Sequence, residues 1–142
     1  KAWNPDVVVI KLGTNDSKKF IWDEHGKEFA GDLQKMIDTL SAIKPNAQKG
    51  VKKAKPRIML CCPIKGDHAD TNEYGRCRDE VIKNEIIPII RQVAKKNKLE
   101  VIDLYDVLTL GTDDFQRDRL HPTKKGAGKI ADAVAEKIKN KK

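Results

Sequence analysis

The feature that most constrains the fold of this chain is the alternation of short apolar runs with longer amphipathic stretches. The three runs are Val7 to Leu12, Arg57 to Cys62 and Glu100 to Leu104. Continuous apolar runs of this length are typical of strands that are covered on both faces of a parallel sheet. We therefore predict three buried, parallel strands.

The segments after these runs carry apolar residues at helical spacing. One helix is predicted over residues 26–43, a second over residues 81–93 and a third from Ile130 to Ile138. Pro88 lies inside the second helix and should kink it or start a new segment. Strands that alternate with helices in this way predict an α/β fold with right-handed crossovers.

Polar segments follow each predicted strand, at the edge of the sheet where α/β proteins bind their ligands. They are GTND (residues 13–16), the loop 63–78 and the loop 109–120, which leads to His121. The first strand is as apolar as a central strand, yet nothing before it in the chain can pair with it. Because a free apolar edge invites aggregation, we expect another segment to cover it.

Composition excludes several classes of protein. The chain has 142 residues, of which 39% are hydrophobic and 35% charged, as expected for one globular domain. No apolar stretch reaches the roughly 20 residues that span a bilayer. The net charge of +8 is concentrated in residues 49–57 and 137–142, without interleaved aromatic residues. We therefore predict neither a nucleic-acid nor a membrane partner.

The 3 cysteines are Cys61, Cys62 and Cys77, an odd number that does not suit a disulfide framework. Cys62 ends a strand and is a conceivable nucleophile, but its apolar surroundings favour a buried thiol. The segment GDHAD (residues 66–70) has side chains that can bind a metal, although such clusters are common in solvated loops. We predict no metal and no cofactor.

The segment DRLH places Asp118 three residues before His121, just ahead of a helix. A carboxylate at this spacing can accept a hydrogen bond from imidazole Nδ1–H, which leaves Nε2 free to act as a general base. The segment GTND offers the Asn15 amide as a donor to a developing oxyanion, and Ser17 nearby is a candidate nucleophile. Taken singly, each segment can equally be an ordinary turn.

Taken together, the two segments resemble the SGNH (GDSL-type) hydrolase family. WNPDVVVIKLGTND is similar to the family's third block, Gly-x-Asn-Asp, and DRLHPTKKGAGKIADAVAEKI is similar to its fifth block, Asp-x-x-His. The stretch NEIIPIIRQVAKKNKLEVIDLYDVL is also similar to bacterial members, so the resemblance covers nearly the whole chain.

The resemblance implies roles for individual residues. His121 would be the catalytic base, Asp118 its orienting partner, Asn15 an oxyanion donor and Gly13 the structural glycine of its block. Ser17 would then be a polar turn residue. The implied fold is a flavodoxin-like three-layer α/β/α sandwich around a parallel sheet, and the implied chemistry is ester hydrolysis through a serine acyl-enzyme, without metal.

The chain departs from the family in lacking the first block, Gly-Asp-Ser, and the second-block glycine, both of which would precede Lys1. We therefore expect residues 1–142 to be the C-terminal part of a single hydrolase domain, inactive without its N-terminal strands and helices. That N-terminal segment is the expected partner. Secretion or a periplasmic location fits the resemblance.

The resemblance implies a small acyl ester as substrate, such as an acetyl group on a carbohydrate. A lipase or lysophospholipase activity is the alternative within the family, and a non-catalytic α/β binding module is the alternative outside it. Tyr74 and Arg76 are candidate substrate contacts on the basis of their position in the loop 63–78.

Overall fold

A single parallel sheet organises the chain. The computed structural model describes residues 5–43, 55–66 and 75–140. The strands of the sheet, in spatial order, are β1 (Val7–Ile10), β2 (Arg57–Cys62) and β3 (Glu100–Asp103). Both pairings are parallel, with Ile10 opposite Leu60 and Cys62 opposite Asp103. The three predicted strands and their direction are confirmed.

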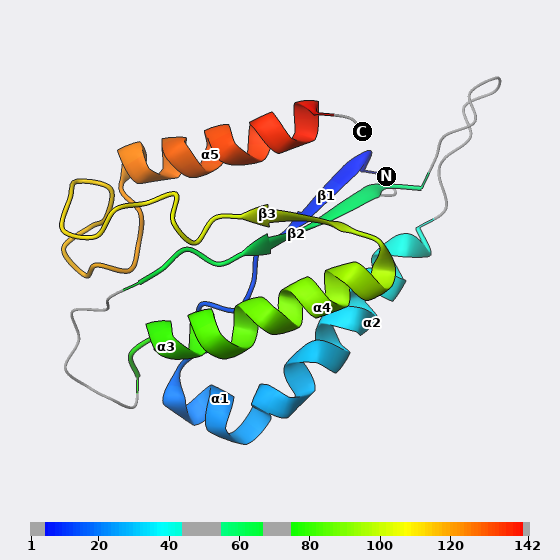
Figure 1. Ribbon diagram of the computed structural model, residues 1–142, viewed down its shortest axis with the longest axis horizontal. Coiled ribbons are helices and arrows are strands. Elements are labelled where there is room, and N and C mark those ends of the chain that lie inside the picture. Colours follow the sequence, from blue (N-terminus) through cyan, green and yellow to red (C-terminus); the bar gives the residue numbers. More distant parts are fainter. Residues whose placement is uncertain (1–4, 44–54, 67–74, 141–142) are drawn as a thin grey trace.

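Helices cover both faces of this sheet, as Figure 1 shows. The helical elements in chain order are α1 (Lys19–His25), η1 (Gly26–Glu28), α2 (Phe29–Ser41), α3 (Asp79–Val81), η2 (Ile82–Ile86), α4 (Ile87–Asn97) and α5 (Lys124–Lys139). Helix α5 lies on one face, whereas α1 to α4 lie on the other (Figure 1). This three-layer α/β/α arrangement is the predicted one. None of the helices in the described ranges is both long and apolar enough to cross a membrane.

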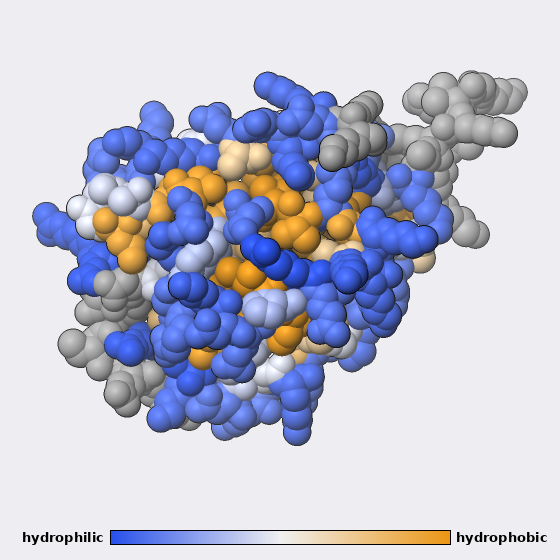
Figure 2. Space-filling view, in the orientation of Figure 1, coloured by the Kyte–Doolittle hydropathy of each residue, from blue (hydrophilic) through white to orange (hydrophobic). Residues whose placement is uncertain are grey.

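The middle strand explains why the apolar runs are continuous. Leu60 and Cys62 belong to the core shared with α2 and α4, whereas Met59 and Cys61 belong to the core shared with α5. All four side chains are buried because both faces of β2 are covered. Figure 2 shows the hydrophobic residues gathered in the band between α5 and α4, with hydrophilic residues outside it.

Two boundaries differ from the predicted ones. Strand β1 ends at Ile10, where pairing with β2 ends, so that Lys11 and Leu12 lie exposed beyond it. Helical structure also begins at Lys19, before the predicted start at residue 26. The additional helix is α1, which the sequence did not predict. Its short sequence, KFIWDEH, buries only Trp22, which is too little to produce a recognisable apolar periodicity.

Pro88 does start a new helical segment. The five-residue segment Ile82–Ile86, which precedes α4, is π-helical, and Pro88 lies in the first turn of α4. Proline has no N–H to donate and its ring crowds the preceding turn, so a wider turn before it relieves both problems.

Strand β1 forms one edge of the described sheet, and exposed apolar residues lie just beyond its end and on α2. Within the described residues β1 pairs with β2 alone. Leu12 is 44% exposed and Met36 is 39% exposed, although both are large hydrophobic residues. They line a hollow of about 220 Å³ together with Trp22, Phe29 and other residues of α1 and α2. Among the described residues β1 is thus an edge strand, and the segment expected to cover it stays a prediction.

Candidate active site

A histidine and an aspartate are in direct contact in the loop that leads into α5. His121 Nδ1 lies 2.6 Å from Asp118 Oδ2. The other carboxylate oxygen, Oδ1, accepts the backbone N–H groups of Leu120 and His121, each at 3.0 Å. Arg119 between them has a φ of 59°, which turns the chain tightly enough for both contacts. Asp118 thus holds the imidazole through a very local network.

These contacts fix the charge of Asp118 and the tautomer of His121. The hydrogen bond from the imidazole, followed by those from the two backbone N–H groups, lowers the pKa of Asp118 to about 2. Asp118 is therefore an ionised acceptor at neutral pH, and Nδ1 must carry the proton that it accepts. The His121 side chain is 67% exposed, so its ring remains accessible. This is the arrangement of a general base with an orienting carboxylate.

The segment around this pair, residues 109–123 (the His121 loop), is anchored to the start of α5. Gln116 donates its backbone N–H to the His121 carbonyl at 2.8 Å. Asp114 is fully buried, and its Oδ2 accepts hydrogen bonds from the Thr109 N–H and from Lys129 Nζ on α5. The N-cap of α5, Thr123, accepts the N–H of Gly126. The sequence predicted a polar loop here, and nothing in it distinguished Asp114, because burial of one carboxylate leaves no sequence signal.

The second predicted segment, residues 13–17 (the Asn15 turn), follows β1. Gly13 has a φ of 112°, and a Cβ on it would lie 2.7 Å from Ile86 Cγ2 and 3.1 Å from Pro63 Cγ. Only glycine suits both that conformation and that space. Asp16 Oδ2 accepts the Gly13 N–H at 3.1 Å and closes the turn, while Asn15 lies exposed at its tip. The Asn15 amide is therefore accessible beyond the end of β1.

Ser17 is not placed as an accessible nucleophile. It is fully buried, and its Oγ donates to the Thr14 carbonyl at 2.7 Å. The same Oγ accepts the backbone N–H of Arg78 at 3.0 Å. Both contacts are those of a structural hydroxyl that stabilises a turn.

Arg78 and Asp79, which the sequence did not single out, form hydrogen bonds with the segments that follow the strands. The Arg78 guanidinium donates from Nε to the Ser17 carbonyl at 2.9 Å and from Nη2 to Asp23 at 2.7 Å. The next residue, Asp79, accepts the Gly66 N–H at 3.2 Å and the Tyr105 hydroxyl at 2.7 Å. Their partners come from the segments after all three strands. No local motif reveals them, because each contact joins residues distant in sequence.

The remaining candidates are placed as follows. Arg76 is exposed at the start of the segment that leads into α3, whereas Tyr74 and residues 67–70 of GDHAD lie outside the described residues. Cys62 is buried and burial raises the pKa of its thiol, as it does for Cys61, whose pKa rises to about 11. Neither thiol has the character of a nucleophile. Among residues 5–43, 55–66 and 75–140, no group of three or more His, Cys, Asp or Glu residues is arranged to hold a metal ion.

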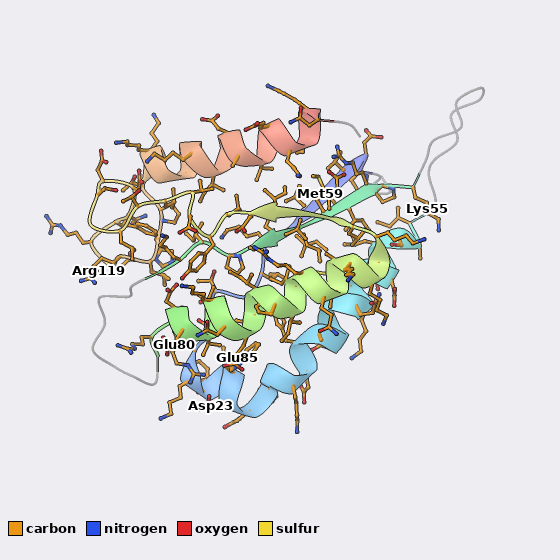
Figure 3. The ribbon with its side chains drawn as sticks, in the orientation of Figure 1. Asp23, Lys55, Met59, Glu80, Glu85 and Arg119 are labelled. Atoms are coloured by element: carbon orange, nitrogen blue, oxygen red, sulfur yellow. The ribbon has the colours of Figure 1, made fainter. Side chains whose placement is uncertain are left out.

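The Asn15 turn and the His121 loop lie at the same edge of the sheet, beyond the carboxyl ends of β1 and β3. In Figure 3, Arg119 marks the His121 loop at one end of the molecule, and Lys55, just before β2, marks the opposite end. In α/β proteins with a parallel sheet, ligands bind outside the carboxyl ends of the strands, so both segments lie where this class of protein carries its functional site. The particular family follows from comparison of the sequence.

The chain belongs to the GDSL-like lipase/acylhydrolase family, whose sequence model matches residues 1–134. It is 44% identical, over 149 aligned positions, to an acetylxylan esterase from Xylanibacter ruminicola. That alignment covers 97% of this chain but only 29% of the relative.

Solved structures show the same fold. The lipase/acylhydrolase from Enterococcus faecalis is 28% identical, with a TM-score of 0.68 over 95% of this chain and 62% of that one. An acetyl xylan esterase, AlAXEase, is 27% identical, with a TM-score of 0.62 over 95% of this chain and 68% of that one. Est24, a carbohydrate acetylesterase from Sinorhizobium meliloti, shares the fold at 20% identity, with a TM-score of 0.71 over 94% of this chain and 60% of that one.

Proposed function

We propose that the protein containing this chain is a serine esterase that removes acetyl groups from a carbohydrate. The observation that carries the proposal is the contact between His121 Nδ1 and Asp118 Oδ2, at 2.6 Å, at the ligand-binding edge of an α/β sheet. The substrate class rests on the 44% identity to an acetylxylan esterase. The chain spans less than a third of that relative, so the activity belongs to the whole protein.

The proposed reaction divides ester hydrolysis into two steps. A serine hydroxyl attacks the acetyl carbonyl while His121 Nε2 accepts the serine proton, and Asp118 stabilises the imidazolium that forms. The Asn15 amide donates a hydrogen bond to the oxyanion of the tetrahedral intermediate. The sugar hydroxyl leaves with the proton from His121, and water then hydrolyses the acetyl-enzyme by the same route.

We propose that residues 1–142 form the C-terminal part of the domain and that the serine comes from a segment encoded before Lys1. The buried Oγ of Ser17, which already has two partners, supports this assignment. The free edge of β1 and the apolar hollow beside Leu12 offer that segment a surface to pack against. Burying such apolar surface is favourable by about 25 cal/mol per Å².

The proposal is tested by expressing the protein with the sequence that precedes Lys1 in its gene. We expect p-nitrophenyl acetate and an acetylated xylo-oligosaccharide to be hydrolysed, and p-nitrophenyl octanoate to be a much poorer substrate. A phosphonate ester probe followed by peptide mass spectrometry should locate the nucleophile upstream of Lys1. A label on Ser17 would overturn that assignment. A preference for the octanoate ester would indicate a lipase instead of an acetylesterase. If no ester is hydrolysed, the proposed activity is wrong and the alternative is a non-catalytic binding module.

A further inference from the structure

Arg78 has an unusual position among the arginines of this chain, because its side chain is directed at the backbone of a proposed catalytic segment. It stands immediately before α3, and its side chain is only 19% exposed. Its Nε donates to the carbonyl of Ser17 at 2.9 Å, and its own backbone N–H donates to Ser17 Oγ at 3.0 Å. Ser17 is therefore held from two sides by one residue that is 61 positions away.

Ser17 in turn determines the shape of the Asn15 turn. Its N–H donates to the Gly13 carbonyl at 3.2 Å, and its Oγ donates to the Thr14 carbonyl at 2.7 Å. The next N–H, of Lys18, donates to the carbonyl of Asn15 itself at 3.2 Å. A contact that restrains the position of Ser17 therefore also restrains the backbone that carries the Asn15 side chain.

The guanidinium is itself fixed at its far end by α1. Its Nη2 forms an ion pair with Asp23 Oδ1 at 2.7 Å, and Asp23 lies on the helix that follows the turn (Figure 3). A planar guanidinium that binds a carboxylate with one nitrogen and a carbonyl with another has a defined orientation, which a lysine ammonium cannot reproduce. The contact with Ser17 is thus preorganised rather than a flexible surface interaction.

We propose that Arg78 is a positioning residue for the reaction, which acts through Ser17 to hold the Asn15 amide where the oxyanion forms. This inference rests on the proposed function. Oxyanion donors are effective only when they are fixed before charge develops, and a displacement of about 1 Å can cost roughly 100-fold in rate. Arg78 contacts Ser17 and Asp23, so its proposed effect on the reaction is exerted through the turn.

The test compares Arg78→Gln with Arg91→Gln in the full-length protein. Arg91 is a matched control because it also pairs with one carboxylate, Asp103 at 2.6 Å, but does not touch the Asn15 turn. We expect Arg78→Gln to lower kcat for p-nitrophenyl acetate by about 10- to 100-fold with KM within about twofold. Arg91→Gln should change neither constant by more than about twofold.

A double-mutant cycle distinguishes positioning from a general structural effect. If Arg78 acts through Asn15, then Arg78→Gln in an Asn15→Ala background should cause little further loss of kcat, because the donor is already absent. Full additivity of the two losses, or an unchanged kcat in Arg78→Gln, would overturn the proposal. Arg78→Lys, which keeps a charge opposite Asp23, replaces Arg78→Gln in the cycle if the latter does not fold.

A measurement without turnover separates this inference from the proposed function. By NMR, the amide protons of Ser17 and Lys18 should exchange about tenfold faster in Arg78→Gln than in the wild type, because the turn opens more often, while those of β2 are unchanged. A wild type that hydrolyses no ester would contradict the proposed function, yet this exchange would still report whether Arg78 holds the turn. Unchanged exchange at Ser17 and Lys18 would overturn the inference on its own.

Discussion

The Asn15 turn and the His121 loop carry the two proposed halves of one active site, but they are built in different ways. His121 owes its orientation to Asp118, three residues away, and both side chains are more than a third exposed. The Asn15 turn depends on Arg78, 61 residues from Ser17, and on the packing of Gly13 against Ile86 and Pro63. The Asp118–His121 pair is thus ordered by local contacts although it is exposed, whereas the Asn15 turn takes its shape from the residues packed against it.

The comparison predicts that side-chain changes in the His121 loop affect activity with little effect on stability, whereas changes to the packing of the Asn15 turn also lower stability. The largest effect is expected for His121→Ala, which should lower kcat/KM for p-nitrophenyl acetate by roughly 10⁴-fold or more in the full-length protein. The midpoint of urea unfolding should hardly change, because the side chain is 67% exposed. A large loss of stability in this variant would show that the loop is not locally built.

Gly13→Ala is expected to produce the largest loss of stability. The new Cβ would lie 2.7 Å from Ile86 Cγ2 at a φ of 112°, so strain and overpacking should lower the free energy of unfolding by about 2 to 4 kcal/mol. The control is Gly31→Ala in α2, where a Cβ meets nothing within 4 Å. That change should increase stability by about 0.5 to 1 kcal/mol, because alanine is the better helix former. Equal effects at both glycines would contradict the role of core packing in the turn.

Ser17→Ala is expected to have a smaller effect of the same kind. It leaves the part-buried N–H of Arg78 without its acceptor, which should lower the free energy of unfolding by about 1 kcal/mol. The contact between Arg78 Nε and the Ser17 carbonyl does not need the hydroxyl, so activity should remain within about tenfold of the wild type. Loss of activity comparable to that of His121→Ala, with folding intact, would instead identify Ser17 as the nucleophile.

The smallest effect concerns the acid dependence of stability. The folded state lowers the pKa of Asp118 to about 2, below the value of roughly 3.9 in an unfolded chain. The stabilisation from its ionised form is therefore fully present above about pH 4 and is lost as the pH falls towards 2. Urea unfolding at several pH values measures the free energy of unfolding of the wild type and of Asp118→Asn. The difference between these two free energies should become smaller as the pH falls across that range. A constant difference would mean that the charge of Asp118 contributes little.

Much of the fold could be predicted from the sequence, because apolar runs and helical spacing report directly which faces are buried. The strands and α5 were evident in this way, and Pro88 predicted either a kink or the new segment that is found there. Helix α1 and the end of β1 at Ile10 were not, because a short helix with one buried residue gives no periodicity and pairing with β2 decides where the strand stops. Tertiary contacts overrode the local pattern at both places.

What the sequence by itself determined is the set of local chemical units: the Asp118–His121 spacing, the Gly13 to Asp16 turn and the alternation that places both beyond strand ends. These could be read because their geometry is set within three or four residues. Only the tertiary structure decided that Ser17 is buried and already satisfied, that Asp114 is an internal anchor and that Arg78 and Asp79 join the strand ends. Each of those roles depends on hydrogen bonds between residues distant in sequence, and the folded backbone is what brings them within reach.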